Sequence, residues 1–278
     1  MSGELLRQRR LRLVQTAALI GVQVVLAVRA AALVLGPAGA FVALGVVAVV
    51  TIHSVTHQQA MFPAGSRVLH AYEAPELFSM LNELVGRAGI GQAPRLILVP
   101  HRSPVALTTG WGAGAVVVVS DGLLASLSAR ELRAVLAHEI AHLRNHDLPL
   151  FALVGAMQRL THLVSVLLTL IVLLGLPLLL MGLVILPPRA LLYLALVPML
   201  SLLTQQALVR TREFQADLGA AELTGDPEAL VWALYRLDRN RSPWWMVMSG
   251  GTARRGGLSE LLSTHPSTRE RIEQLRAL

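Results

Sequence analysis

The sequence predicts a mostly helical α+β protein with four transmembrane helices arranged in two hairpins. The composition is strongly apolar, with 54% hydrophobic and 15% charged residues, whereas a typical soluble domain carries about 25% charged residues. Four apolar segments occur as two pairs, and each pair is joined by a very short linker. Outside these pairs the sequence shows helix-type and strand-type periodicity, which predicts an α+β region beside the membrane helices.

A helix needs roughly 20 residues to cross a bilayer, and the length of each apolar segment is compared with this value. The second apolar segment is the shortest, and it reaches this length only together with its flanking residues. The linkers are residues 36–39 and 187–189, and both are too short to cross back, so each pair forms a hairpin. The four expected spans are Leu13–Leu35, Phe41–Ile52 with its flanks, Leu163–Leu186 and Ala190–Val209.

The distribution of arginine predicts the orientation of these hairpins. All 24 basic residues are arginine, and 22 of them fall on the side where the hairpins begin and end. Only Arg29 and Arg189 lie within a span or on the opposite side. Because basic residues favour the cytoplasmic side of a membrane, we expect both termini and nearly all extramembrane mass to be cytoplasmic.

The composition also excludes some functions. The chain contains no cysteine, so it forms no disulfide and has no thiolate metal ligand. Its net charge of +7 comes without a long basic run or a base-stacking motif, which argues against a nucleic-acid partner. The spans hold few polar residues, which makes a channel or transporter the least favoured class.

The region between the hairpins is predicted as helix, strands and further helices. A helix with an apolar stripe is expected over residues 75–87 and stops before Gly89. Glycines in residues 110–114 indicate a turn. Short apolar runs predict three strands and a following helix, at residues 95–99, 105–109, 115–119 and 121–127.

Residues 128–145 form the segment that carries chemistry. Ser128 and Glu131 have the spacing of a capping box, which fixes the start of a helix. Within this helix stands His138-Glu139-Ile140-Ala141-His142. Histidines four residues apart share one helical face and can bind one zinc ion. Glu139 projects beside the metal, where it can take a proton from a water molecule.

A catalytic zinc of this kind takes a third protein ligand from elsewhere in the chain. Glu213 and Asp217 are carboxylates four residues apart in a helical register, a repulsive pair in an ordinary helix. We assign Glu213 as the ligand and Asp217 as the acceptor that orients a ligand histidine. The spacing alone is equally consistent with a solvated acidic face.

The sequence resembles the M48 peptidases, and in particular the HtpX-like membrane proteases, from about Ala71 to the C-terminus. Four groups of residues carry this resemblance. They are Ala74-Pro75-Glu76-Leu77, the His-Glu-Ile-Ala-His helix followed by Asn145 and Asp147, Glu213-Phe214-Gln215-Ala216-Asp217, and Thr264-His265-Pro266 with Arg271-Ile272.

The resemblance implies a zincin-like endopeptidase of the bacterial plasma membrane that binds one Zn²⁺ per chain. Its partners would be the lipid bilayer and polypeptides, notably damaged or misfolded membrane proteins in quality control and stress response. It also implies that Glu213 is the third ligand. The expected domains are an N-terminal arm and hairpin (1–58), a cytoplasmic catalytic core (59–160), a second hairpin (161–209) and a C-terminal catalytic part (210–278).

One departure from the family concerns the edge strand expected to align the substrate. The family pattern is Asn-Ala-Phe-Ala-Thr-Gly, whereas this chain has Val105-Ala106-Leu107-Thr108-Thr109-Gly110. A polar substrate contact is therefore absent at Val105, although the main chain of an edge strand can still pair with a peptide. This departure motivates one alternative, a weakly active or inactive zinc-binding regulator. A processing protease of narrow specificity is a second alternative.

Two further residues have open interpretations. His265 either hydrogen-bonds the oxyanion of the reaction as a catalytic residue, or is structural at the start of a last helix beginning near Pro266. Arg271 either pairs with a carboxylate near the site or lies on a solvated helix face, and we favour the solvated face.

Overall fold

The computed structural model describes residues 3–36, 38–56, 64–182, 188–239 and 266–278. The chain divides into two compact units. The sheet unit comprises residues 1–12, 55–149 and 210–278, and the helical unit comprises residues 13–54 and 150–209.

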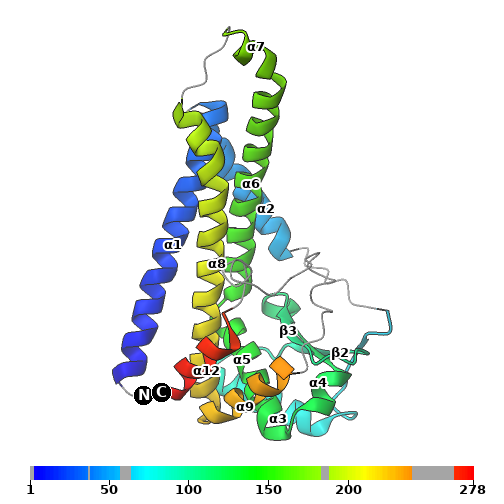
Figure 1. Ribbon diagram of the computed structural model, residues 1–278. Coiled ribbons are helices and arrows are strands. Elements are labelled where there is room, and N and C mark those ends of the chain that lie inside the picture. The colour runs from blue at the N-terminus through cyan, green and yellow to red at the C-terminus, as the bar shows by residue number, and fades with distance from the viewer. Residues whose placement is uncertain (1–2, 37, 57–63, 183–187, 240–265) are drawn as a thin grey trace. The chain divides into compact units, whose positions relative to one another are not determined.

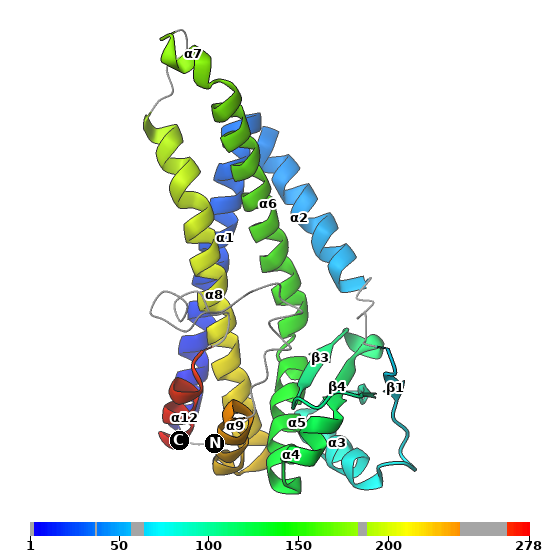
Figure 2. The ribbon, with the colours of Figure 1, turned by 45° about the vertical axis from the view of Figure 1, so that its right-hand side comes forward.

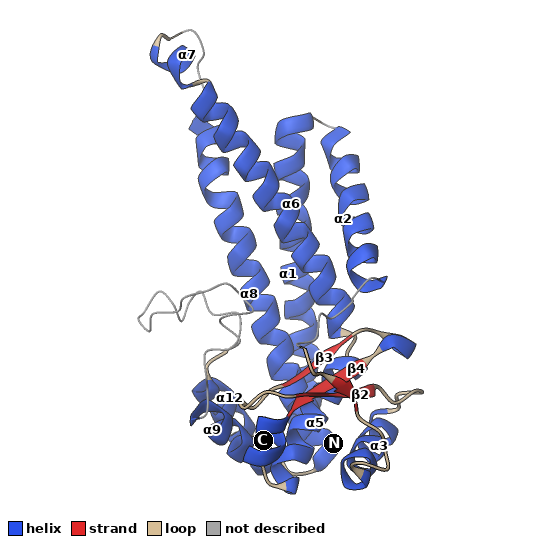
Figure 3. Cartoon of the chain, turned by 90° about the vertical axis from the view of Figure 1, so that its right-hand side faces the viewer, coloured by secondary structure: helices blue, strands red, loops and turns tan. Residues whose placement is uncertain are grey.

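The sheet unit is built on a four-stranded mixed sheet with the strand order β1-β2-β4-β3 (Figure 3). Strand β4 pairs in parallel with β2 and antiparallel with β3, while β1 pairs antiparallel with β2. Within the part of the chain that the structure describes, strand β3 is therefore an edge strand. The strands are β1 (Arg67–Val68), β2 (Arg95–Val99), β3 (Ala106–Thr109) and β4 (Val116–Ser120), with a single 3₁₀ turn, η1 (Gly112–Gly114), between the last two.

Helices of the same unit form one apolar core with one face of this sheet (Figure 2). They are α3 (Pro75–Ala88), α4 (Asp121–Ser126), α5 (Ala129–Arg144), α9 (Pro227–Arg239) and α12 (Thr268–Arg276). Fully buried leucines and valines, including Leu81, Leu136 and Val117, join helices and strands into one core. A smaller cluster around Ile97 and Val118 occupies the other face of the sheet. These strands and helices confirm the predicted α+β pattern.

Local signals in the sequence set the ends of these helices. Ser128 and Glu131 form the predicted capping box at the start of α5, with both reciprocal bonds present. Helix α3 ends at Gly89, whose φ of 69° is in the left-handed region that glycine adopts freely. The last helix begins at Thr268 rather than near Pro266, because Ser267 and Glu270 form a second capping box there.

The helical unit contains parts of long helices that run alongside one another (Figure 1). The helices are α1 (Gly3–Leu35), α2 (Ala38–Thr56), α6 (Asp147–Leu174), α7 (Leu176–Leu180) and α8 (Pro188–Thr224). Helix α6 begins at Asp147, well before the apolar segment expected from residue 163. Helix α8 is continuous over 37 residues and joins the expected fourth span directly to the segment that carries Glu213.

The prediction of four spans is corrected by these helices. Among the described residues, two helices are long and apolar enough to cross a membrane, at Arg10–Ala32 and Asp147–Leu174. The apolar helix Ala38–His53 is shorter, because 16 residues rise about 24 Å at 1.5 Å each, less than the hydrocarbon thickness of about 30 Å. The expected fourth span, at the start of α8, does not meet the criterion within the described residues.

Buried polar side chains connect three helices of the helical unit. The Gln23 amide donates to Ser201 Oγ at 2.6 Å, and Ser201 in turn donates to Gln158 Oε1 at 2.5 Å. Thr204 donates to the other end of the Gln23 side chain. Because unpaired polar groups are costly in an apolar surrounding, this cluster fixes α1, α6 and α8 against one another.

Candidate metal centre

The centre is built on the buried half of α5. His138, Glu139 and His142 are 7%, 8% and 8% exposed, and the apolar residues around them pack into the core. Helix α5 ends at Arg144 with Asn145 as its C-cap, and His146 then takes a φ of 55°, which few residues other than glycine adopt. This turn allows α6 to start at once, and it places Asp147, the first residue of α6, beside the last turn of α5.

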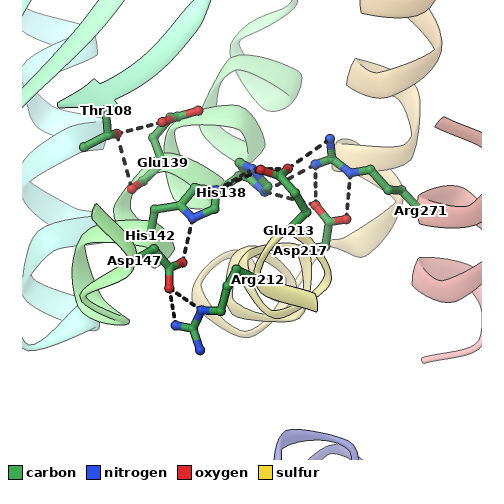
Figure 4. A network of polar contacts seen from close by, with 9 residues as sticks. All are labelled: Thr108, His138, Glu139, His142, Asp147, Arg212, Glu213, Asp217 and Arg271. Carbon is green, nitrogen blue, oxygen red and sulfur yellow. Dashed lines mark hydrogen bonds and ion pairs between the residues drawn. The ribbon is translucent and has the colours of Figure 1, made fainter. Parts of the chain in front are cut away.

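The structure brings the third expected ligand to both histidines. His138 Nε2 lies 3.1 Å from His142 Nε2. Glu213, on α8, places its two carboxylate oxygens 3.6 Å from His138 Nε2 and 3.7 Å from His142 Nε2. All three side chains are buried, and their ligand atoms lie within 4.8 Å of one another. Figure 4 shows the three converging from two helices.

These distances fit a zinc ion. Tetrahedral bonds of about 2.0–2.1 Å place neighbouring ligand atoms about 3.3 Å apart. The observed separations of 3.1, 3.6 and 3.7 Å bracket that value. Two histidines and one glutamate are also a donor set used by catalytic zinc, with the fourth position left open. His138, His142 and Glu213 therefore form a metal-binding triad.

The hydrogen bonds of the two imidazoles also indicate that the triad binds a cation. His142 Nδ1 lies 2.7 Å from Asp147 Oδ2, and His138 Nδ1 lies 3.0 Å from Asp217 Oδ1. An ionised aspartate only accepts hydrogen bonds, so the Nδ1 atoms carry the protons. When both rings are neutral, their Nε2 lone pairs point at each other, and a cation between them removes that repulsion.

The pKa of His138 reflects the same attraction for positive charge. Burial alone lowers this pKa, but hydrogen bonds to Asp217 and Glu213 outweigh burial and raise it to about 10. Burial alone would raise the pKa of Asp217, yet the charge and hydrogen bonds of Arg271 hold it below its ordinary value. The cluster thus holds Asp217 ionised and draws a cation to the histidines.

An arginine pairs with each of the two aspartates. Arg271 donates to both Asp217 oxygens, at 2.8 and 2.5 Å, and its side chain is 13% exposed. Arg212 is 4% exposed and pairs with Asp147. The preference for a solvated Arg271 was therefore wrong: α12 packs against the site, and the buried Asp217 requires a cationic partner.

Of the remaining predicted residues, the structure describes Glu139 and Val105 but not His265. Glu139 lies beside the triad and accepts a 2.7 Å hydrogen bond from Thr108, on β3. Val105 lies one residue before β3 and is buried, with its amide bound to Ser120 Oγ and its carbonyl to the Ser120 amide. His265 lies outside the described residues, so its role stays a prediction.

Sequence reasoning gave no role to several residues of this site. Asp147 was recognised only as part of a family pattern, although two ligand histidines need two acceptors for their Nδ1 protons. Arg212 directly precedes Glu213, and the need to neutralise a buried aspartate is the signal that could have identified it. Nothing in the sequence pattern indicated the contact between Thr108 and Glu139, which links a strand to a helix 31 residues away.

A buried cation-binding triad beside a glutamate and an edge strand defines the class of this protein as a metallopeptidase of the His-Glu-x-x-His type. The sequence pattern of Peptidase family M48 matches residues 71–278. The chain belongs to this family and is an M48 zinc metalloprotease. This confirms the resemblance found in the sequence.

Several relatives are similar over most of their length. A protease HtpX homolog of Bifidobacterium longum is 34% identical, covering 84% of this chain and 80% of its own. One from Acaryochloris marina is 33% identical, covering 95% and 94%. The crystal structure of S. mikatae Ste24p is 21% identical, with a TM-score of 0.49, and covers 99% of this chain and 66% of that one. The chain is an HtpX-like membrane protease.

Close packing of α8 on α5 is required to bring Glu213 to the histidines, and Gly219 permits it. A Cβ atom at Gly219 would lie 2.7 Å from Ala141 Cβ and 2.9 Å from the Arg144 guanidinium. We expect Gly219→Ala to lower the free energy of unfolding by about 1–3 kcal/mol through overpacking and to weaken zinc binding.

Thermal unfolding in detergent and competition with a zinc chelator would measure these two effects. The matched control is Gly86→Ala in α3, where nothing lies within 4 Å of the added Cβ and better helix propensity adds up to about 1 kcal/mol. Equal behaviour of the two variants would show that the α5–α8 contact does not set the site.

Proposed function

We propose that this protein is a membrane-bound zinc endopeptidase that hydrolyses misfolded or damaged membrane proteins at the cytoplasmic face, in protein quality control. The observation that carries the proposal is the convergence of His138 Nε2, His142 Nε2 and Glu213 within a 4.8 Å cluster. It is supported by Glu139 beside this cluster and by the edge strand β3, which contacts Glu139 through Thr108.

One zinc ion per chain, held by the triad, would polarise the scissile carbonyl and lower the pKa of a water molecule to about 7. Glu139 takes the proton of the attacking water and then delivers it to the amide nitrogen of the leaving segment. In our proposal, His265 donates a hydrogen bond to the oxyanion of the tetrahedral intermediate. Asp217 and Asp147 orient the two histidines through Nδ1.

The substrate is an extended polypeptide segment. Among the described residues, strand β3 pairs with β4 alone, so its other edge can add a peptide as a further strand. Such pairing uses main-chain groups and depends little on side chains. It therefore favours unfolded segments of many sequences, recognised along residues Val105, Ala106, Leu107 and Thr108.

The membrane arrangement we propose has both termini and the catalytic residues in the cytoplasm of a bacterial cell. The two helices that meet the length criterion, Arg10–Ala32 and Asp147–Leu174, support insertion in a membrane. The placement of 22 of 24 arginines on one side of the apolar segments supports the orientation. Labelling of single cysteines introduced at Ser2 and Arg276, in intact cells and in broken cells, tests it. The expected result is that both react only after the cells are broken.

The buried state of Val105 favours a second candidate, a regulator that holds zinc but cleaves little. Its side chain is 8% exposed, and Ser120 binds both its amide and its carbonyl. Under this candidate Val105→Asn would raise cleavage strongly, whereas an endopeptidase already active with Val105 would change little.

Metal-dependent proteolysis tests the proposed function. Purified protein in detergent is incubated with casein, an unfolded substrate, before chelation, after chelation and after addition of zinc. We expect internal cleavage before chelation, none afterwards, and recovery with zinc. A protein that binds one zinc per chain and leaves casein intact under all conditions would contradict the broad endopeptidase function and favour the regulatory candidate.

A further inference from the structure

Thr108 contacts the proposed general base from the edge strand. Its hydroxyl donates to Glu139 Oε2 at 2.7 Å and lies 3.4 Å from the Glu139 carbonyl oxygen (Figure 4). Ala106 and Thr108 share the face of β3 that is directed to the helices, since Leu107, between them, packs on the opposite face.

The main chain of Thr108 is also directed to the edge of β3 that pairs with no other described strand. Antiparallel pairs alternate between those that exchange main-chain hydrogen bonds and those that do not. The Ser120 amide donates to the Val105 carbonyl, and the register continues with Ala106 opposite Val119 and Thr108 opposite Val117. The amides and carbonyls of Ala106 and Thr108 therefore point away from β4.

We propose that Thr108 is a positioning residue that couples substrate docking to the general base. Its amide and carbonyl pair with the main chain of the bound peptide, and its hydroxyl holds Glu139 Oε2. This inference rests on the proposed function. It explains how the edge strand links the peptide to the catalytic glutamate.

The hydrogen bond from Thr108 gives the two carboxylate oxygens of Glu139 different roles. Glu139 Oε2 is occupied by Thr108, which leaves Oε1 to take the proton of the attacking water. The new C–O bond forms at the scissile carbonyl carbon, the C–N bond breaks, and the proton passes from Oε1 to the leaving nitrogen. Thr108 keeps its own proton throughout, so it orients the base and does not take part in the transfer.

The test compares Thr108→Val, which keeps the shape and removes the hydroxyl, with Thr108→Ser, which restores the hydroxyl, and with the smaller Thr108→Ala. The control is Thr169→Val on α6, whose exposed hydroxyl donates to a carbonyl of its own helix. Cleavage of a fluorogenic peptide gives kcat and KM, and zinc content per chain is measured on each preparation.

We expect Thr108→Val and Thr108→Ala to lower kcat about 10- to 100-fold, the effect of losing one hydrogen bond to a charged group. KM should stay within about threefold because main-chain pairing remains. Zinc content should be unchanged, Thr108→Ser should recover most of kcat, and Thr169→Val should match the wild type.

Three results would overturn the inference. Wild-type kcat in both hydroxyl-free variants would show that Glu139 needs no support from Thr108. Loss of zinc or of folding in both, or equal loss in Thr108→Ser, would assign Thr108 a structural role. Zinc-loaded wild type that cleaves neither casein nor the peptide would remove the proposed function and this inference together, whereas active wild type with unaffected variants removes the inference alone.

Discussion

Glu139→Gln is expected to abolish peptide cleavage while leaving zinc in place. Glutamine keeps the size of the side chain but cannot accept a proton at neutral pH, and general-base catalysis contributes about 10²- to 10⁴-fold to such reactions. The metal should remain because the triad consists of His138, His142 and Glu213, and the Glu139 carboxylate is bound by Thr108 instead. We therefore expect a fall in kcat of that size with one zinc per chain.

Casein cleavage measures the loss of activity, and elemental analysis of the same preparation measures the zinc that remains bound. Glu228→Gln is the matched control, because this glutamate lies on α9 and is about half exposed. It should cleave at the wild-type rate. If Glu139→Gln also cleaved at the wild-type rate, Glu139 would not be the general base.

Asp217→Asn is expected to weaken zinc binding about 10- to 100-fold, the usual cost of losing the partner of a ligand histidine. Asp217 is fully buried between His138 and Arg271. Its neutralisation leaves the Arg271 charge buried with the more distant Glu213 carboxylate at 3.6 Å. Breaking a buried ion pair on one side costs on the order of 3–5 kcal/mol of stability.

A double-mutant cycle with Arg271→Met tests this pair. We expect the double variant to lose less stability than the two single variants together, because it leaves no unpaired buried charge. The control is Asp226→Asn, whose pair with Arg130 has similar bidentate geometry at the surface and should cost less than about 1 kcal/mol. Additive losses at Asp217 and Arg271 would show that the two side chains act independently.

The sequence predicted those parts of the fold that depend on neighbouring residues. The capping box of Ser128 and Glu131 and the glycine stop at Gly89 are local effects, and both ends were placed correctly. The spans were placed less well, because apolar composition does not show where a helix starts. Helix α6 begins at Asp147, where the turn at His146 ends α5, and this turn has no signature in periodicity.

The site also contains residues that a single segment of sequence predicts and residues that depend on packing between distant segments. His138, Glu139 and His142 follow from spacing along one helix, whereas Glu213 was one of two interpretations until the family resemblance was considered. The contacts of Thr108 and Arg271 join elements that are distant in the sequence. They depend on how β3 and α12 pack against the site, and no single segment of the sequence contains that information.

The two arginine–aspartate pairs also determine the electrical balance of the centre. Four carboxylates surround the two histidines, which bind a metal ion as neutral rings, on Glu139, Asp147, Glu213 and Asp217, and Arg212 and Arg271 neutralise two of them. The pocket thus retains two negative charges, which one divalent ion cancels and which a sodium ion would cancel only by half. Selection against monovalent ions is therefore built into the protein by its arginines as well as by its ligands.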